Sequence, residues 1–210
     1  MKYYSQLGQD EFLDNFFNKK ENGTFVDIGA HDGTSCSNSL FFEESRNWNG
    51  LCIEPSPKEF EILSSFRKSI NINACVSDYD GESEFLYLEG YPNMLSGLVE
   101  SYNNQHISRI NHEIKSYGGN YTKINMPVFR LQTILDKNNL YEIDICSIDT
   151  EGSEFNIVKS IDYVKTNIKV FTIENNYQTN EIKDFLETKG YVLLKKIQWD
   201  DIFVKKDLKV

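Results

Sequence analysis

Long apolar runs are absent from this sequence. No stretch of its 210 residues approaches the roughly 20 consecutive apolar residues that cross a bilayer. The first six residues also lack the apolar centre of a secretory signal peptide. We therefore expect a soluble, cytoplasmic protein with no membrane span.

Basic residues are scarce as well. The 22 Lys and Arg residues stand against 32 Asp and Glu residues, which leaves a net charge of −10 at pH 7. Such a surface repels nucleic-acid phosphates and anionic lipid headgroups, because non-specific binding to either depends on cationic side chains. We expect neither nucleic acid nor a membrane surface as a partner.

Closely spaced cysteines are missing. The four cysteines show no C-x-x-C spacing, which argues against a zinc site or a redox motif. Cys52, Cys75 and Cys146 lie in apolar stretches and are interpreted as reduced thiols in a core, typical of a reducing compartment.

The apolar residues that are present form short runs, which alternate with segments of helical period. This alternation predicts an α/β fold with a doubly wound sheet of about seven strands, ending in an antiparallel hairpin. The predicted strands are residues 24–28, 51–54, 70–76, 82–88, 143–149, 170–174, 191–197 and 201–205. Residues 82–88 are expected as an antiparallel addition after the turn at Asp80-Gly81. We expect a single domain over residues 1–210, with no second core.

Three helices have distinct sequence signals. Phe12, Leu13, Phe16 and Phe17 share one face of a helix in the N-terminal segment 1–22. Ser56-Pro57-Lys58-Glu59 combines a capping serine, a first-turn proline and a capping-box acid. The helix that follows is expected to bury Phe60, Leu63 and Phe66. Thr179 is the expected cap of a later helix that ends at Gly190.

Residues 90–125 interrupt this regular pattern. The segment is rich in Tyr, Asn, Ser and Gly and contains His106 and His112. An insertion of this length in a compact domain is usually functional or disordered. Its tyrosines favour an ordered lid or an acceptor-binding surface.

Polar residues follow consecutive predicted strands at the edge where α/β sheets bind ligands. Asp27 and Gly29 end the first strand, Glu54 ends the second, and Ser77-Asp78 follow the third. The G-x-G-x-x-G dinucleotide motif is absent. An acid in the place of Glu54 can accept both hydroxyls of a ribose. Each acid alone is also compatible with a helix cap or a solvated strand end, but together they favour a nucleoside ligand.

Five segments carry a resemblance to a known family. They are Ser5 to Asp10, Val26 to Gly33 with Ser37 to Ser39, Trp48 to Pro55, Ala74 to Asp78, and Ile148 to Glu154. In these segments the chain resembles the FkbM family of S-adenosylmethionine-dependent methyltransferases. The resemblance implies a Rossmann-like fold and methyl transfer to a hydroxyl of a sugar or glycan, including nucleotide sugars, oligosaccharides and glycosylated products.

The resemblance also implies a cofactor site. The residues it assigns to S-adenosylmethionine are Gln6, Asp27, Gly29, Ala30, Asn38, Glu54, Pro55, Ser77 and Asp78. Asp27 and Gly29 are expected at the methionine end, Glu54 at the ribose, and Ser77 with Asp78 at the adenine. The Gln6 segment is expected to close over the methionine carboxylate.

A sugar hydroxyl is a weak acid, so a base or a metal must help to remove its proton. Asp149, after the fourth strand, is the first candidate base, and Glu151 and Glu154 are candidates to orient the acceptor or cap a helix. Asp149 with Glu174 and Asn175 resembles the magnesium site of catechol-type O-methyltransferases, and oxygen ligands suit such an ion. His106 and His112 are the remaining candidate bases.

Two other functions stay open. One is a nicotinamide-dependent sugar oxidoreductase, against which the missing glycine motif argues. The other is a non-catalytic cofactor-binding domain that binds a partner through the tyrosine-rich insertion. The sequence leaves open the acceptor, the hydroxyl position and the oligomeric state, with a homodimer as one option.

Overall fold

The computed structural model describes residues 2–208 and contains two β-sheets. The larger sheet has seven strands in the order β10-β11-β9-β8-β1-β2-β3. Their bounds are β1 Thr24–Ile28, β2 Asn49–Ile53, β3 Ile70–Ile72, β8 Glu142–Ile148, β9 Asn167–Glu174, β10 Tyr191–Ile197 and β11 Asp200–Lys205. Neighbouring strands from β3 to β9 are parallel, whereas β11 is antiparallel to both β9 and β10. The predicted seven-stranded sheet and its closing hairpin are therefore confirmed.

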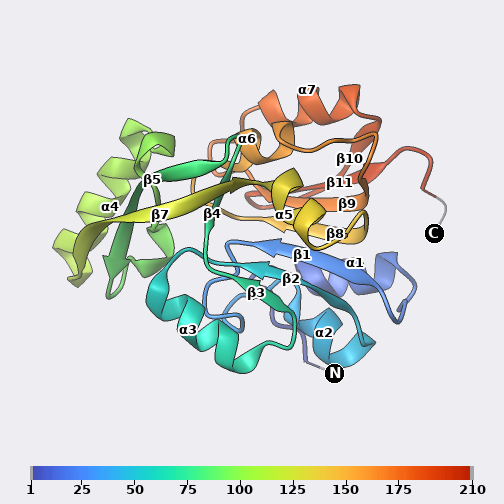
Figure 1. The fold of residues 1–210 in the computed structure, drawn as a ribbon, viewed down its shortest axis with the longest axis horizontal. Helices are drawn as coiled ribbons and strands as arrows, with labels where there is room; N and C mark the ends of the chain where they lie inside the picture. The colour runs from blue at the N-terminus through green and yellow to red at the C-terminus, as the bar shows by residue number, and fades with distance from the viewer. Residues whose placement is uncertain (1, 209–210) are drawn as a thin grey trace.

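Helices cover both faces of this sheet (Figure 1). Their bounds are α1 Gln9–Phe16, α2 Leu40–Arg46, α3 Pro57–Phe66, α5 Leu131–Lys137, α6 Glu154–Lys159 and α7 Glu181–Thr188. Alternate residues of each strand point to opposite faces. Phe25 packs in the core beneath α1, α2 and α3, and Val26 packs in the core beneath α5, α6 and α7. Each helical layer therefore packs on the apolar side chains that one face of the buried strands presents.

A second, four-stranded sheet lies beyond the carboxyl ends of the parallel strands (Figure 1). It has the order β4-β7-β5-β6 and is accompanied by the helix α4. The bounds are β4 Cys75–Ser77, β5 Gly81–Glu89, β6 Gly97–Leu98, β7 Asn120–Arg130 and α4 Asn104–Tyr117, with short 3-10 turns at Asn93–Leu95 (η1) and Val99–Ser101 (η2). The insertion is therefore ordered, and its strand β7 pairs antiparallel with the whole of β5.

Two expectations about this region are wrong. The segment 70–76 is not one strand, because β3 pairs with β2 while β4 pairs with β7 in the other sheet. The chain changes sheets at Asn73, whose amide donates to the carbonyl oxygens of Glu54 at 2.8 Å and Pro55 at 3.0 Å. A second apolar core also exists, formed by Cys75, Phe85, Leu98, Met126 and Val128. The two sheets stay connected, because Phe129 of β7 packs against the core of the larger sheet.

The helix ends differ from expectation in detail. Pro57 begins α3 after Ser56 as predicted, but the Ser56 side chain makes no capping hydrogen bond. Glu59 instead accepts a hydrogen bond from Asn93 of η1 at 3.2 Å, so no capping box forms. Phe66, expected in the core, is 52% exposed. Asn180, not Thr179, is the residue before α7.

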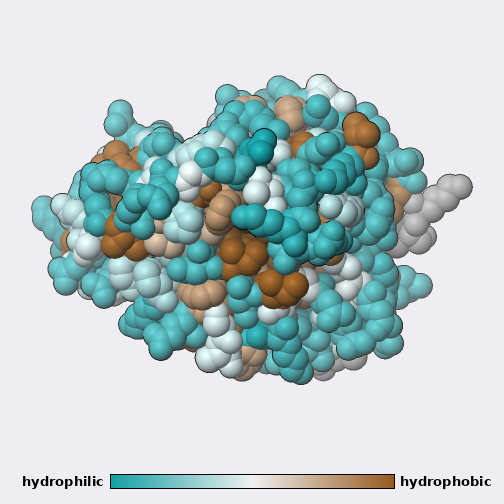
Figure 2. Space-filling model, in the orientation of Figure 1, coloured by the Kyte–Doolittle hydropathy of each residue, from teal (hydrophilic) through white to brown (hydrophobic). Residues whose placement is uncertain are grey.

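The surface shown in Figure 2 is largely polar, with apolar side chains gathered mainly near its middle. Within residues 2–208, no helix combines the length and the apolar character needed to cross a bilayer. All four cysteines are free thiols, and Cys52, Cys75 and Cys146 are buried as predicted.

Asp144, in β8, ties neighbouring strands together through its carboxylate. It accepts hydrogen bonds from Lys20 Nζ and Lys169 Nζ, both at 2.7 Å, and from the Thr24 amide at 2.9 Å. Burial alone would raise the pKa of Asp144, but the hydrogen bonds from Lys169 and Lys20 outweigh it and hold the pKa below its usual value. A group with a lowered folded pKa stabilises the fold above its unfolded pKa, and this contribution is lost as the pH falls through the folded pKa.

We expect Asp144→Asn to lower the free energy of unfolding by about 2 kcal/mol at pH 7, because hydrogen bonds to a charged group are lost. The deficit should shrink as the pH falls below about 4, because the unfolded wild-type protein then binds a proton that the folded carboxylate resists. Urea unfolding at pH 7 and pH 3 measures both values. Asp207→Asn, at an exposed position, is the control. A deficit that is equal at the two pH values would contradict this role.

Candidate active site

A cavity of about 380 Å³ lies at the carboxyl ends of the central parallel strands, between the two sheets. Residues that follow the strands of the larger sheet line one side of it: Asp27, Gly29, Ala30, Glu54, Pro55, Asp149, Glu151 and Glu174. The second sheet and α4 supply Phe85, Leu98 and Arg109, and the N-terminal segment supplies Gln6. The volume is in the range of ligand sites in proteins.

The backbone of the loop after β1 lies against the backbone at the ends of β2 and β8. Gly29 has φ of +81°, and its amide donates to the Ile53 carbonyl at 2.9 Å. A Cβ at Gly29 would lie 1.7 Å from the carbonyl oxygen of Asp149. Only glycine fits here, because both the left-handed backbone and the contact with Asp149 exclude a side chain.

Asp27, in β1 just before this loop, is 4% exposed. Burial raises its pKa, opposed by the charge of Arg67 and by a hydrogen bond from Ser39. Arg67 also donates to Ser39 Oγ at 2.9 Å. Nearby, Asn38 donates to Ser147 Oγ at 3.0 Å, while its own amide oxygen is buried without a hydrogen-bond partner. That oxygen is an acceptor that a bound ligand can use.

Glu54, at the end of β2, is buried and faces the cavity. Its two carboxylate oxygens accept the backbone amides of His31 at 2.8 Å and Ser56 at 2.7 Å. Burial raises the pKa of Glu54, and the hydrogen bonds from Ser56 and His31 oppose that rise. Each carboxylate oxygen has two lone pairs, so Glu54 can still accept hydrogen bonds from a ligand.

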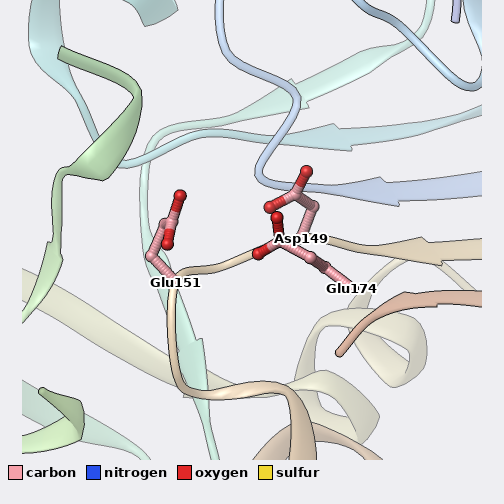
Figure 3. A group of neighbouring side chains, drawn as sticks. All are labelled: Asp149, Glu151 and Glu174. Atoms are coloured by element: carbon pink, nitrogen blue, oxygen red, sulfur yellow. The ribbon is translucent and has the colours of Figure 1, made fainter. Parts of the chain in front are cut away.

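Three acids form the acidic group of the site: Asp149 after β8, Glu151 in the next loop, and Glu174 at the end of β9 (Figure 3). One carboxylate oxygen of each lies within 4.8 Å of the others. In Figure 3 the carboxyl groups of Asp149 and Glu174 are adjacent, with that of Glu151 across from them. Asp149 is open to solvent through the cavity, yet protein surrounds it closely enough to desolvate it.

Burial raises the pKa of all three carboxyls, and neighbouring acids raise them further. The adjacent carboxyls of Asp149 and Glu174 repel one another when both are ionised, which favours one proton shared between them. The two groups therefore titrate as a pair.

Glu154, at the start of α6, organises the loop that carries these acids. Its Oε1 accepts hydrogen bonds from the amides of Thr150 at 3.0 Å and Gly152 at 2.9 Å. The loop is held in a strained form, with Glu151 at φ of +57°. Of the two roles considered for Glu154, the helix-end role is the one that its contacts support.

The structure brings together most, but not all, of the predicted site residues. Those that line the cavity are Gln6, Asp27, Gly29, Ala30, Asn38, Glu54, Pro55, Asp149, Glu151 and Glu174. Ser77, Asp78 and Asn175 are not among the lining residues. Ser77 is buried in β4, and Asp78 lies 3.6 Å from Lys159 Nζ. The Asn175 amide donates to Thr179 O at 2.9 Å and to Asp201 Oδ2 at 2.8 Å.

The change of sheet at Asn73 explains why Ser77 and Asp78 do not line the cavity. It places Ala74, Cys75 and Val76 against the cavity instead of Ser77 and Asp78. Sequence reasoning also missed Phe85, Leu98 and Arg109. No local pattern marks these three, since Phe85 and Leu98 reach the cavity through the pairing of β5 with β6, and Arg109 through the position of α4.

The two histidines of the insertion do not line the cavity. His106 is buried, with Nε2 3.2 Å from the Leu95 carbonyl and Nδ1 3.4 Å from Glu151 Oε2. Burial lowers its pKa. His112 is exposed on α4. Neither position supports the expectation of a histidine base that touches the acceptor.

The sheet order, the antiparallel closing hairpin and the cavity at the carboxyl edge define a Rossmann-like methyltransferase fold. Comparison with family models gives the family. The model of the methyltransferase FkbM domain matches residues 27–193. The chain therefore belongs to the FkbM methyltransferase family, as the sequence resemblance indicated.

Solved structures are similar in fold. Methyltransferase FkbM from Methylobacillus flagellatus KT is 14% identical with a TM-score of 0.50, and the match covers 87% of this chain and 43% of that one. The chain thus spans less than half the length of that protein. The human methyltransferase 10 domain containing protein is 12% identical with a TM-score of 0.46, covering 95% and 81% of the two chains. Comparison with curated proteins gave no match.

Gly29→Ala should disrupt the site, because the new Cβ meets the Asp149 carbonyl. Gly8→Ala is a matched control, since Gly8 has the same φ of +81° but no atom within 4 Å of a Cβ. Both variants carry the backbone penalty of about 1–2 kcal/mol. We expect Gly29→Ala to lose clearly more stability than Gly8→Ala in thermal unfolding. Equal losses would show that the contact with Asp149 is relieved without cost.

Proposed function

We propose that this protein is an S-adenosylmethionine-dependent O-methyltransferase that acts on a hydroxyl of a sugar or glycan. The observation that carries the proposal is the set of acceptor groups at one sheet edge, Asp27, Asn38, Glu54 and Asp149, all facing one cavity. Membership of the FkbM methyltransferase family supports the reaction class.

The cavity residues fit the cofactor. S-adenosylmethionine offers an ammonium group and two ribose hydroxyls as hydrogen-bond donors. Buried Asn38 Oδ1 has no donor of its own, and Glu54 retains free lone pairs. The apolar wall formed by Ala74, Val76 and Phe85 suits a flat base. When bound, the cofactor supplies an electrophilic methyl group on a sulfonium.

Asp149 is the proposed base. Methyl transfer to a hydroxyl oxygen requires that the hydroxyl proton be removed as the new bond forms. Burial and the neighbouring acids raise the pKa of Asp149, which makes its ionised carboxylate a stronger base than that of an ordinary aspartate. Glu151, on the same side of the cavity, is placed to orient the acceptor.

We further propose that the acidic group binds a divalent cation such as magnesium. Three carboxylate oxygens within 4.8 Å match the hard oxygen ligands that Mg²⁺ prefers. Glu151 Oε2 accepts no hydrogen bond, and its neighbour from α4 is His106, with Nδ1 3.4 Å away. The proposed ligands are therefore Asp149, Glu151 and Glu174. Asn175 is not among them, because its amide oxygen accepts the Thr179 N–H at 3.0 Å and the residue does not line the cavity. Such an ion would lower the charge of the group and hold neighbouring acceptor hydroxyls.

The proposal is tested by a screen with methyl-labelled S-adenosylmethionine against nucleotide sugars and short oligosaccharides. We expect label on a sugar product and at least a ~100-fold lower kcat in Asp149→Asn, because general base catalysis contributes about 10²–10⁴-fold. Cofactor affinity should change little. Asp78→Asn, outside the cavity, is the control and should behave as wild type. Full turnover in Asp149→Asn would remove Asp149 as the base.

Removal of divalent cations tests the metal separately. We expect excess EDTA to lower the initial rate at least ~10-fold and added Mg²⁺ to restore it, because the acids would otherwise repel one another. Binding of S-adenosylhomocysteine, followed by calorimetry, should persist in EDTA. Activity that is undiminished in excess chelator would exclude the metal ion but not the role of Asp149 as the base.

A further inference from the structure

One cation faces the acids of the cavity. Arg109, on α4, is the one Lys or Arg among the cavity-lining residues that the structure describes. It comes from the insertion, so it lies on the side of the cavity formed by the second sheet and α4. Asp149, Glu151 and Glu174 line the side formed by the larger sheet.

Arg109 forms no ion pair with these three acids among the described residues. Its ion pair is with Glu113, one turn along its own helix, where Nε lies 3.1 Å from Oε1. No ion pair joins Arg109 to Glu151 or Glu174 in residues 2–208, although their charges raise its pKa against the effect of burial. Its side chain is 50% exposed. The two terminal nitrogens, which carry four N–H donors, therefore remain available.

A guanidinium in this position has a defined chemical preference. Its planar fork of donors matches the paired oxygens of phosphate and carboxylate groups, and it stays charged at any physiological pH. A neutral sugar hydroxyl binds the guanidinium less strongly than an anion does, because charge on both partners strengthens the hydrogen bond. An acceptor with an anionic group on the Arg109 side can keep its reacting hydroxyl on the Asp149 side.

We infer that Arg109 selects an acceptor sugar that carries an oxyanion, either a phosphate or a carboxylate. This inference rests on the proposed function and narrows its substrate class. The anion binds on the α4 side of the cavity, and the reacting hydroxyl binds on the side of the larger sheet. A phosphosugar or nucleotide sugar supplies the phosphate, and a uronic acid supplies the carboxylate.

The test is calorimetric binding of three probes that share one ring to protein saturated with S-adenosylhomocysteine. The probes are glucose, glucose 1-phosphate and glucuronic acid. We expect at least one anionic probe to bind 10-fold or more tighter than glucose, with a preference that weakens as NaCl is raised. Arg109→Gln should abolish that preference, and Arg109→Lys should retain part of it. The phosphate and carboxylate arms identify the source of the anion.

Arg130→Gln is the matched control, because Arg130 is also 50% exposed and ion-paired but lies outside the cavity. It should keep the wild-type preference. Equal or undetectable binding of the three probes, or a preference that survives in Arg109→Gln, would overturn the inference. Either result leaves the proposed methyl transfer standing, whereas failure of the protein to bind S-adenosylhomocysteine at the start would sink the proposed function itself.

Discussion

Repulsion between acids is the constraint on which the site depends. Asp149, Glu151 and Glu174 offer oxygens within 4.8 Å of one another, and Asp27 and Glu54 line the same cavity. Two like charges about 4 Å apart repel by about 4 kcal/mol at an effective dielectric of 20. That is a large part of the stability of a domain. The free protein therefore relieves the repulsion with shared protons, and a cationic ligand relieves it further.

The two sheets contribute different parts of the site. The larger sheet fixes the acids, because its parallel strands end together and Gly29 lets the loop after β1 lie against the Asp149 backbone. The second sheet and α4 close the cavity with an apolar wall and with Arg109. The guanidinium of Arg109 lowers the repulsion between the acids, and the cationic cofactor and divalent ion of the proposed function would lower it further.

Much of the larger sheet was predictable because its signals are local. The strand predicted at 24–28 is β1 to the residue, since a buried apolar run bounded by glycines allows few alternatives. Asp27 and Glu54 followed from it, because parallel strands place their ends at one edge. The switch at Asn73 was not predictable, since it depends on carbonyl groups almost 20 residues away in sequence. Arg109 and the misplaced Ser77, Asp78 and Asn175 depend on such distant contacts too.

The most direct test is whether the cavity binds the methyl-donor nucleoside rather than a dinucleotide. Calorimetric titration of the unmodified protein with S-adenosylhomocysteine, and separately with NAD, measures this without knowledge of the acceptor. The acidic edge around Glu54, with no dinucleotide glycine motif before it, predicts saturable binding of S-adenosylhomocysteine and no heat from NAD. Tight binding of NAD with no response to S-adenosylhomocysteine would contradict the proposed function and favour a sugar oxidoreductase.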